Sequence, residues 1–157
     1  MALAVPLSRF TSRVGGGSAF FVRPHYTRFM TQQEINKAFR DRAEICRDAT
    51  KHMMKIELLY DEASLLRVDD IISKAWPAGS SGGDIKKRCE IWASYVGECL
   101  RAIFGGDWVK TEAGWGVKIG QVVLNVFAKM EKRLQSGMTD SISFFYEAFK
   151  QQSRRVA

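Results

Sequence analysis

Apolar residues recur every three or four positions along most of this 157-residue chain, a period that predicts helices. Neither glycine nor proline interrupts residues 25–76, and the apolar positions there alternate with charged ones. This pattern predicts a first helix over about 32–56. Its apolar stripe consists of Ile35, Phe39, Cys46 and Met53.

Two further helices are predicted before residue 105. After a short extended link at residues 58–60, Asp61 is suited to cap a helix that runs to about residue 75. Pro77 and the Gly/Ser run at 79–83 end this helix in a loop. A third helix is expected from about Asp84 to Phe104. Because it is apolar on most of its circumference, we place it at the centre of the domain.

The hydrophobic period then changes to two, which is typical of strands. Residues 108–111, 116–119 and 122–125 predict an antiparallel meander of three short strands. Two more helices follow: the first ends at Gly137, and Thr139 or Asp140 is suited to cap the second. The expected fold class is therefore α+β, with three helices, a three-stranded antiparallel meander and two helices.

Residues 1–30 differ from the rest of the chain, because they contain arginine and serine but no acidic residue. On a helix, Arg9 and Arg13 lie opposite an apolar face. This composition is typical of a mitochondrial targeting segment, with a plastid as the second choice. We therefore expect import to the mitochondrial matrix or the matrix face of the inner membrane, followed by a single domain at 31–157. The candidate targeting residues are Arg9, Arg13, Arg23 and Arg28.

Composition narrows the possible partners. The chain is 46% hydrophobic and 26% charged, as in an ordinary globular protein, and its apolar runs are too short for a membrane span. Four of its 24 basic residues lie in 1–30, so 20 face 17 acidic residues in the remainder. A nucleic-acid partner is therefore only weakly indicated. The short basic runs at 86–88 and 154–155 fit either a phosphate-binding patch or a solvated surface.

Four segments carry a resemblance to a known family. They are Tyr60–Leu65, Tyr95–Arg101, Phe104–Trp108 with Gly114–Gly116, and Lys132–Gly137 with Asp140–Ile142. With them, residues 58–149 resemble a family of uncharacterised bacterial domains known only as a domain of unknown function. The sequence departs from that family at 126–127, where a proline-containing turn is more usual. The resemblance implies a compact α+β core at about 58–150, preceded by the N-terminal helix at 31–57, and implies no activity.

The residues that carry chemistry are few. The three cysteines are odd in number and lack C-x-x-C spacing, which argues against disulfides and a zinc site. Two histidines give little material for a metal site or a triad, so we identify no catalytic, metal or cofactor-binding residue and no small-molecule substrate. Glu98 is the most interesting acid. With Arg101 one turn later, it is either a half-buried acid beside a pocket or a structural ion pair.

Several apolar residues are candidates for binding a partner. Trp108 and Trp115 flank the first hairpin, where they either form an exposed anchor or pack onto a helix beneath the sheet. The first helix presents a similar alternative. Its stripe of Ile35, Phe39 and Met53 either enters a groove of a partner protein or completes the core of this domain.

Three hypotheses follow. The first is a non-catalytic accessory protein of mitochondria, a subunit of a larger complex of respiratory or ATP-synthase type that binds other proteins. The second is an RNA- or ribosome-associated mitochondrial protein that uses the basic runs. The third, which has the least support, is an enzyme built around Glu98.

Overall fold

A computed structural model describes residues 29–76 and 85–156. The targeting segment, with Arg9, Arg13, Arg23 and Arg28, lies outside the described residues, and so does the Gly/Ser run at 79–83. The fold class is α+β, as predicted, with one three-stranded antiparallel sheet. The elements in chain order are α1 (Gln32–Met54), α2 (Glu62–Leu66), α3 (Val68–Ala75), α4 (Ile85–Phe104), β1 (Asp107–Thr111), β2 (Gly114–Ile119), β3 (Val122–Leu124), α5 (Val126–Ser136), the 3-10 turn η1 (Gly137–Asp140) and α6 (Ile142–Val156).

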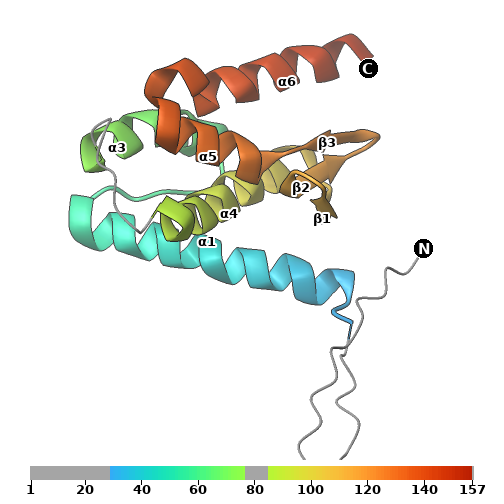
Figure 1. Ribbon diagram of the computed structural model, residues 1–157, viewed down its shortest axis with the longest axis horizontal. Coiled ribbons are helices and arrows are strands. Elements are labelled where there is room, and N and C mark those ends of the chain that lie inside the picture. Colours follow the sequence, from blue (N-terminus) through green and yellow to red (C-terminus); the bar gives the residue numbers. More distant parts are fainter. Residues whose placement is uncertain (1–28, 77–84, 157) are drawn as a thin grey trace, which may run out of the picture.

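Helix α4 lies at the centre of the arrangement, as its apolar circumference predicted. Helix α1 runs antiparallel to α4 along one side, while α5 and α6 lie on the other (Figure 1). The sheet lies at the end of the molecule where α4 finishes (Figure 1). All ten residues from Trp92 to Arg101 are buried or half-buried, because neighbours cover every side of the helix.

The first helix completes the core of this domain and does not extend away from it. Thr31 and Glu34 form a reciprocal capping box that fixes its start. From there α1 packs along α4, and the buried residues Phe39, Ala43 and Cys46 face the core. The apolar stripe of α1, for which binding in a groove of a partner protein was the alternative, is therefore largely covered by this chain itself.

Met53 does not belong to the buried stripe of α1, contrary to the prediction. Its side chain is 82% exposed, whereas Thr50 is buried. At 100° per residue, Phe39 and Thr50 lie 40° and 60° around the helix from Met53, near the middle of the buried arc. Ile35 and Met53 share one direction at the edge of that arc, and Ile35 is accordingly only partly buried.

The helix predicted over residues 61–75 is instead two helices, α2 and α3, separated at Arg67. Asp61 caps α2 as predicted, because its side chain accepts a hydrogen bond from the Ser64 N–H. The Arg67 N–H bonds to the Ser64 carbonyl at 3.2 Å, an i to i−3 bond that tightens the turn. The helix that follows buries the adjacent residues Val68 and Asp69.

The sheet is the predicted meander, in the order β1-β2-β3. The first turn of α1 covers the outer edge of β1: Gln32 Nε2 donates to the Trp108 carbonyl at 2.8 Å, and Asn36 Oδ1 accepts from the Trp108 N–H at 3.2 Å. Unpaired strand edges invite pairing with other chains, and these side chains occupy part of this one. The sheet and α1 are thereby joined through residues 72 or more positions apart.

Candidate functional site

Glu98 is almost completely buried, with 2% of its surface exposed. Its Oε1 accepts hydrogen bonds from Trp108 Nε1 at 2.8 Å and from Arg101 Nη1 at 2.7 Å, while its Oε2 accepts one from Arg40 Nη1 at 3.3 Å. Arg101 also donates through Nε to the Gly106 carbonyl at 3.0 Å. The carboxylate therefore links α1, α4 and the start of β1.

Trp108 is the centre of this cluster. Its ring stacks on Phe39 at a centroid distance of 4.0 Å. The indole also lies so close to Gly97 of α4 that a side chain at that position would collide with it. Trp115 meets Phe39 edge to face at 5.0 Å and is only partly buried. Trp108 is thus a core residue and not an exposed stacking surface.

The geometry of the Glu98 cluster is that of a structural joint. Both carboxylate oxygens accept hydrogen bonds from this chain, and Glu98 is almost completely buried. General acid–base catalysis needs a carboxyl within hydrogen-bond reach of a substrate atom. In this geometry Glu98 forms the structural ion pair that was the alternative to a half-buried acid beside a pocket.

A second buried ion pair was missed by the sequence analysis. Asp69 and Arg133 are 4% and 3% exposed, and Arg133 Nε donates to Asp69 Oδ1 at 2.6 Å. Asp69 also accepts from the Ile142 N–H at 3.1 Å and the Ser143 N–H at 2.8 Å, at the start of α6. Both charged residues occupy apolar-stripe positions, since Asp69 follows Leu65 by four residues. That phase is the signal that predicts their burial.

Asp69 also explains how α6 begins. The prediction that Thr139 or Asp140 caps this helix is wrong. Both residues lie in η1, and Ser141 accepts from the Phe144 N–H at 3.1 Å. Burial opposes ionisation of Asp69, but hydrogen bonds from the Ser143 N–H, Arg133, the Ile142 N–H and Ser141 outweigh it and hold the pKa of Asp69 below its ordinary value.

The three cysteines have the surroundings of ordinary buried residues. Burial raises the pKa of the Cys89 and Cys99 thiols to about 12 and that of Cys46 further, so all three are neutral. In the described ranges, no three His, Cys, Asp or Glu residues cluster as metal ligands, and no helix is long and apolar enough to cross a membrane.

The two basic runs do not form one surface, because α4 begins at the opposite end of the molecule from the end of α6 (Figure 1).

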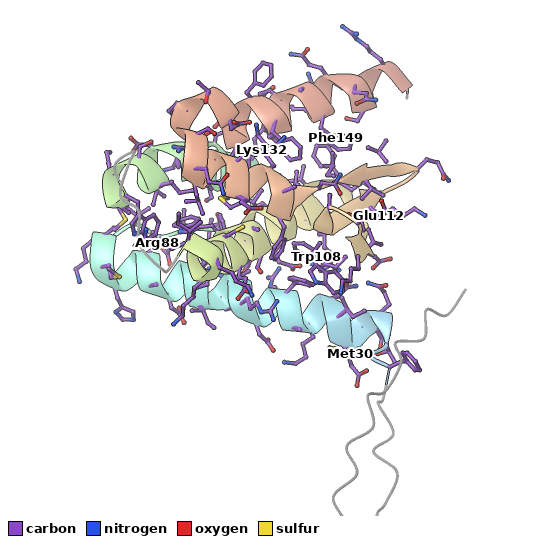
Figure 2. The ribbon with its side chains drawn as sticks, viewed as in Figure 1. Met30, Arg88, Trp108, Glu112, Lys132 and Phe149 are labelled. Atoms are coloured by element: carbon purple, nitrogen blue, oxygen red, sulfur yellow. The ribbon has the colours of Figure 1, made fainter. Side chains whose placement is uncertain are left out.

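An apolar cavity of about 310 Å³ opens between α1, α3 and α4. Met53 and Thr50 line it from α1, Trp76 from the end of α3, and Arg88 and Trp92 from α4. Figure 2 shows Arg88 and Trp108 at opposite ends of the interface between α1 and α4, so the cavity is remote from the Glu98 cluster. No local pattern in the sequence indicates this cavity, because its walls come from three separate helices.

Two aromatic rings and one cation dominate the cavity wall. Trp76 meets Trp92 edge to face at 6.2 Å, and the Arg88 guanidinium carbon lies 5.0 Å from the centroid of a Trp76 ring. Such a distance is typical of a cation–π contact. Trp76 and Arg88 also line a neighbouring cavity of about 190 Å³, so this stacked pair forms a wall that the two cavities share.

Comparisons with protein-family models, with curated proteins and with solved structures found no match. The resemblance of residues 58–149 to uncharacterised bacterial domains therefore stays a prediction.

Proposed function

We propose that this protein is a non-catalytic interaction protein of mitochondria that works as a subunit of a larger assembly, of respiratory or ATP-synthase type. Two observations support the non-catalytic part. The buried acids Glu98 and Asp69 each accept hydrogen bonds from this chain at both carboxylate oxygens, and each joins elements that are distant in sequence. Groups used in this way hold the fold together and are not available to a substrate.

Phe144 is the observation that carries the interaction proposal. Its side chain is 75% exposed, yet its backbone N–H is fixed by Ser141, whose hydroxyl in turn donates to Asp69 at 2.8 Å. The neighbouring Ser143 hydroxyl donates to the carbonyl of Leu66, which is itself exposed. Aromatic residues on a rigid backbone are the usual anchors of protein interfaces, because little conformational entropy is lost when they are buried.

The basic runs support an RNA-associated function less than Phe144 supports a protein-interaction function. Phosphate binding needs several cations on one continuous surface. Here Arg154 and Arg155 lie near the end of α6, while Lys86 and Lys87 begin α4 at the other end of the molecule (Figure 1). We therefore keep the protein-interaction function as the single proposal.

The test replaces Phe144 with serine in a tagged full-length protein. Mitochondria are isolated, dissolved in mild detergent and separated by native electrophoresis. We expect the wild type to migrate in a large assembly and Phe144→Ser to shift to the monomer. Because the ring is exposed, its removal should change the free energy of unfolding by no more than about 0.5 kcal/mol.

Gln151→Ser is the matched control, since Gln151 is exposed two turns later on the same face of α6. This control should stay in the assembly. If the wild type migrates as a monomer, the subunit proposal is wrong. If Phe144→Ser stays assembled, Phe144 is not the anchor. Tagged protein found outside mitochondria refutes the localisation separately.

A further inference from the structure

The cavity between α1, α3 and α4 opens to the surface, and the exposed residue Met53 is part of its lining. At about 30 Å³ per non-hydrogen atom, the share of water in the liquid, the cavity of 310 Å³ holds roughly ten such atoms. This volume lies at the lower end of the range for small-molecule sites, about 300–1,000 Å³.

The lining defines what kind of molecule fits. The wall of the cavity is mostly apolar and includes Ala49, Met54, Ala75 and Ile91. The hydroxyl of Thr50, which also lines it, already donates to the Cys46 carbonyl at 2.8 Å. Water in such a space has few partners, whereas hydrocarbon is well accommodated. Methionine side chains are flexible and adapt to irregular apolar ligands.

Arg88 is the one cation in this lining. Its guanidinium carbon lies 5.0 Å from the centroid of a Trp76 ring, and the side chain makes no ion pair with another described residue. A cation–π contact does not use the N–H groups of the guanidinium as hydrogen-bond donors, so they can still pair with a ligand. Two parallel N–H groups of a guanidinium match the two oxygens of a carboxylate.

We propose that this cavity binds an amphipathic carboxylate of about ten non-hydrogen atoms. Its apolar body lies against Trp76, Trp92 and the methionines, and its carboxylate pairs with Arg88. The site is independent of the Phe144 surface, because the residues that line it belong to α1, α4 and the end of α3. A free acyl acid and an aromatic acid share this chemistry, and the experiment separates them.

The test is calorimetric titration of the purified full-length protein with octanoate and, separately, with cinnamate. Octan-1-ol and octylamine replace the carboxylate head with a neutral and a cationic group. We expect the acid that fits best to bind with a Kd on the order of 0.1 mM. The alcohol should bind about tenfold more weakly or worse, and the amine should not bind. Tryptophan fluorescence should change on binding, and Trp76→Phe should reduce the change.

Arg88→Met removes the charge but keeps an unbranched side chain of similar reach. We expect it to weaken carboxylate binding by about tenfold to a hundredfold and to leave the alcohol unaffected. Lys87→Met is the matched control, because Lys87 is exposed in the same turn of α4 and does not line the cavity. Ala75→Leu fills part of the space and should abolish binding of every ligand. Circular dichroism and urea midpoints establish that each variant is folded.

Preference for octanoate identifies an acyl acid and preference for cinnamate an aromatic one, and either supports the site. Absence of binding by both acids at 10-fold above the expected Kd overturns the proposal. Equal binding of octan-1-ol and octanoate also overturns it, as does an Arg88→Met protein that binds as the wild type does. None of these measurements depends on an assembly, so they leave the Phe144 proposal untouched.

Discussion

Replacing Gly97 with alanine should destabilise this protein severely, although alanine is normally the better residue in a helix. A Cβ atom at Gly97 would lie 2.1 Å from Cη2 and 2.2 Å from Cζ2 of Trp108. Non-bonded carbons prefer about 3.5–4.0 Å, so the indole must move by more than about 1 Å. It is held by its stack on Phe39 and by its hydrogen bond to Glu98.

The magnitude follows from three contributions. Overpacking of a core costs about 1–3 kcal/mol. Loss of the hydrogen bond from Trp108 to the charged Glu98 costs about 1.5–3 kcal/mol. The higher helix propensity of alanine offsets about 1 kcal/mol of this loss of stability, because alanine replaces glycine inside a helix. The net loss is about 1.5–5 kcal/mol, a large part of a total stability of about 5–15 kcal/mol.

Urea unfolding monitored by circular dichroism measures this loss as a lower midpoint with an unchanged slope. Trp108→Phe provides the control, because its shorter ring does not fill the same space above residue 97. Gly97→Ala should therefore cost less in the Trp108→Phe background than in the wild type. A Gly97→Ala protein as stable as the wild type would refute the close packing of α4 on Trp108.

Three further predictions concern other parts of the chain. Asp69→Asn should lower the free energy of unfolding at pH 7 by about 3–5 kcal/mol, because it leaves Arg133 buried and unpaired. The native pKa of Asp69 is depressed below 3.8, so its contribution to the free energy of unfolding is complete above about pH 4 and is lost as the pH falls through that native pKa. The Asp69→Asn variant should lack this pH-dependent contribution. Urea midpoints measured between pH 2 and 7 test this. The three buried thiols should resist alkylation by iodoacetamide at pH 8 until urea unfolds the protein, and rapid labelling of the native protein would contradict their burial. Arg9→Glu with Arg13→Glu should leave the protein in the cytosol by fractionation, whereas unchanged mitochondrial localisation would exclude the targeting role.

The sequence predicted the elements well where the pattern is local. The apolar circumference of α4 placed it at the centre, and the change of period after Gly106 located the three strands. Local patterns failed where a distant residue decides the outcome. The break at Arg67 accompanies the burial of Asp69, whose partner Arg133 lies 64 residues away, and the same carboxylate helps begin α6. No periodicity encodes such a pairing.

The candidate sites show the same division. The position of Glu98 on the central helix indicated a buried acid, and the alternative of a structural ion pair is what its three donors form. The exposure of Met53 follows from its position at the edge of the buried arc of α1, a phase that is present in the sequence and that the predicted stripe overlooked. The cavity beside Met53 could not be predicted, since its walls come from helices that the sequence separates.

The bonds between α1 and the edge of β1 set an order of events when the chain is made. Asn36 leaves the ribosome well before Trp108, its partner 72 residues later. Until residues 85–108 have followed, α1 has neither the α4 surface nor the strand edge to cover Phe39 and Cys46. The amphipathic helix must therefore remain uncovered during most of synthesis, and again during any N-terminus-first passage through a membrane pore. Folding of this chain is consequently completed late, after the sheet has emerged, and an early-acting holding chaperone would find its target in α1.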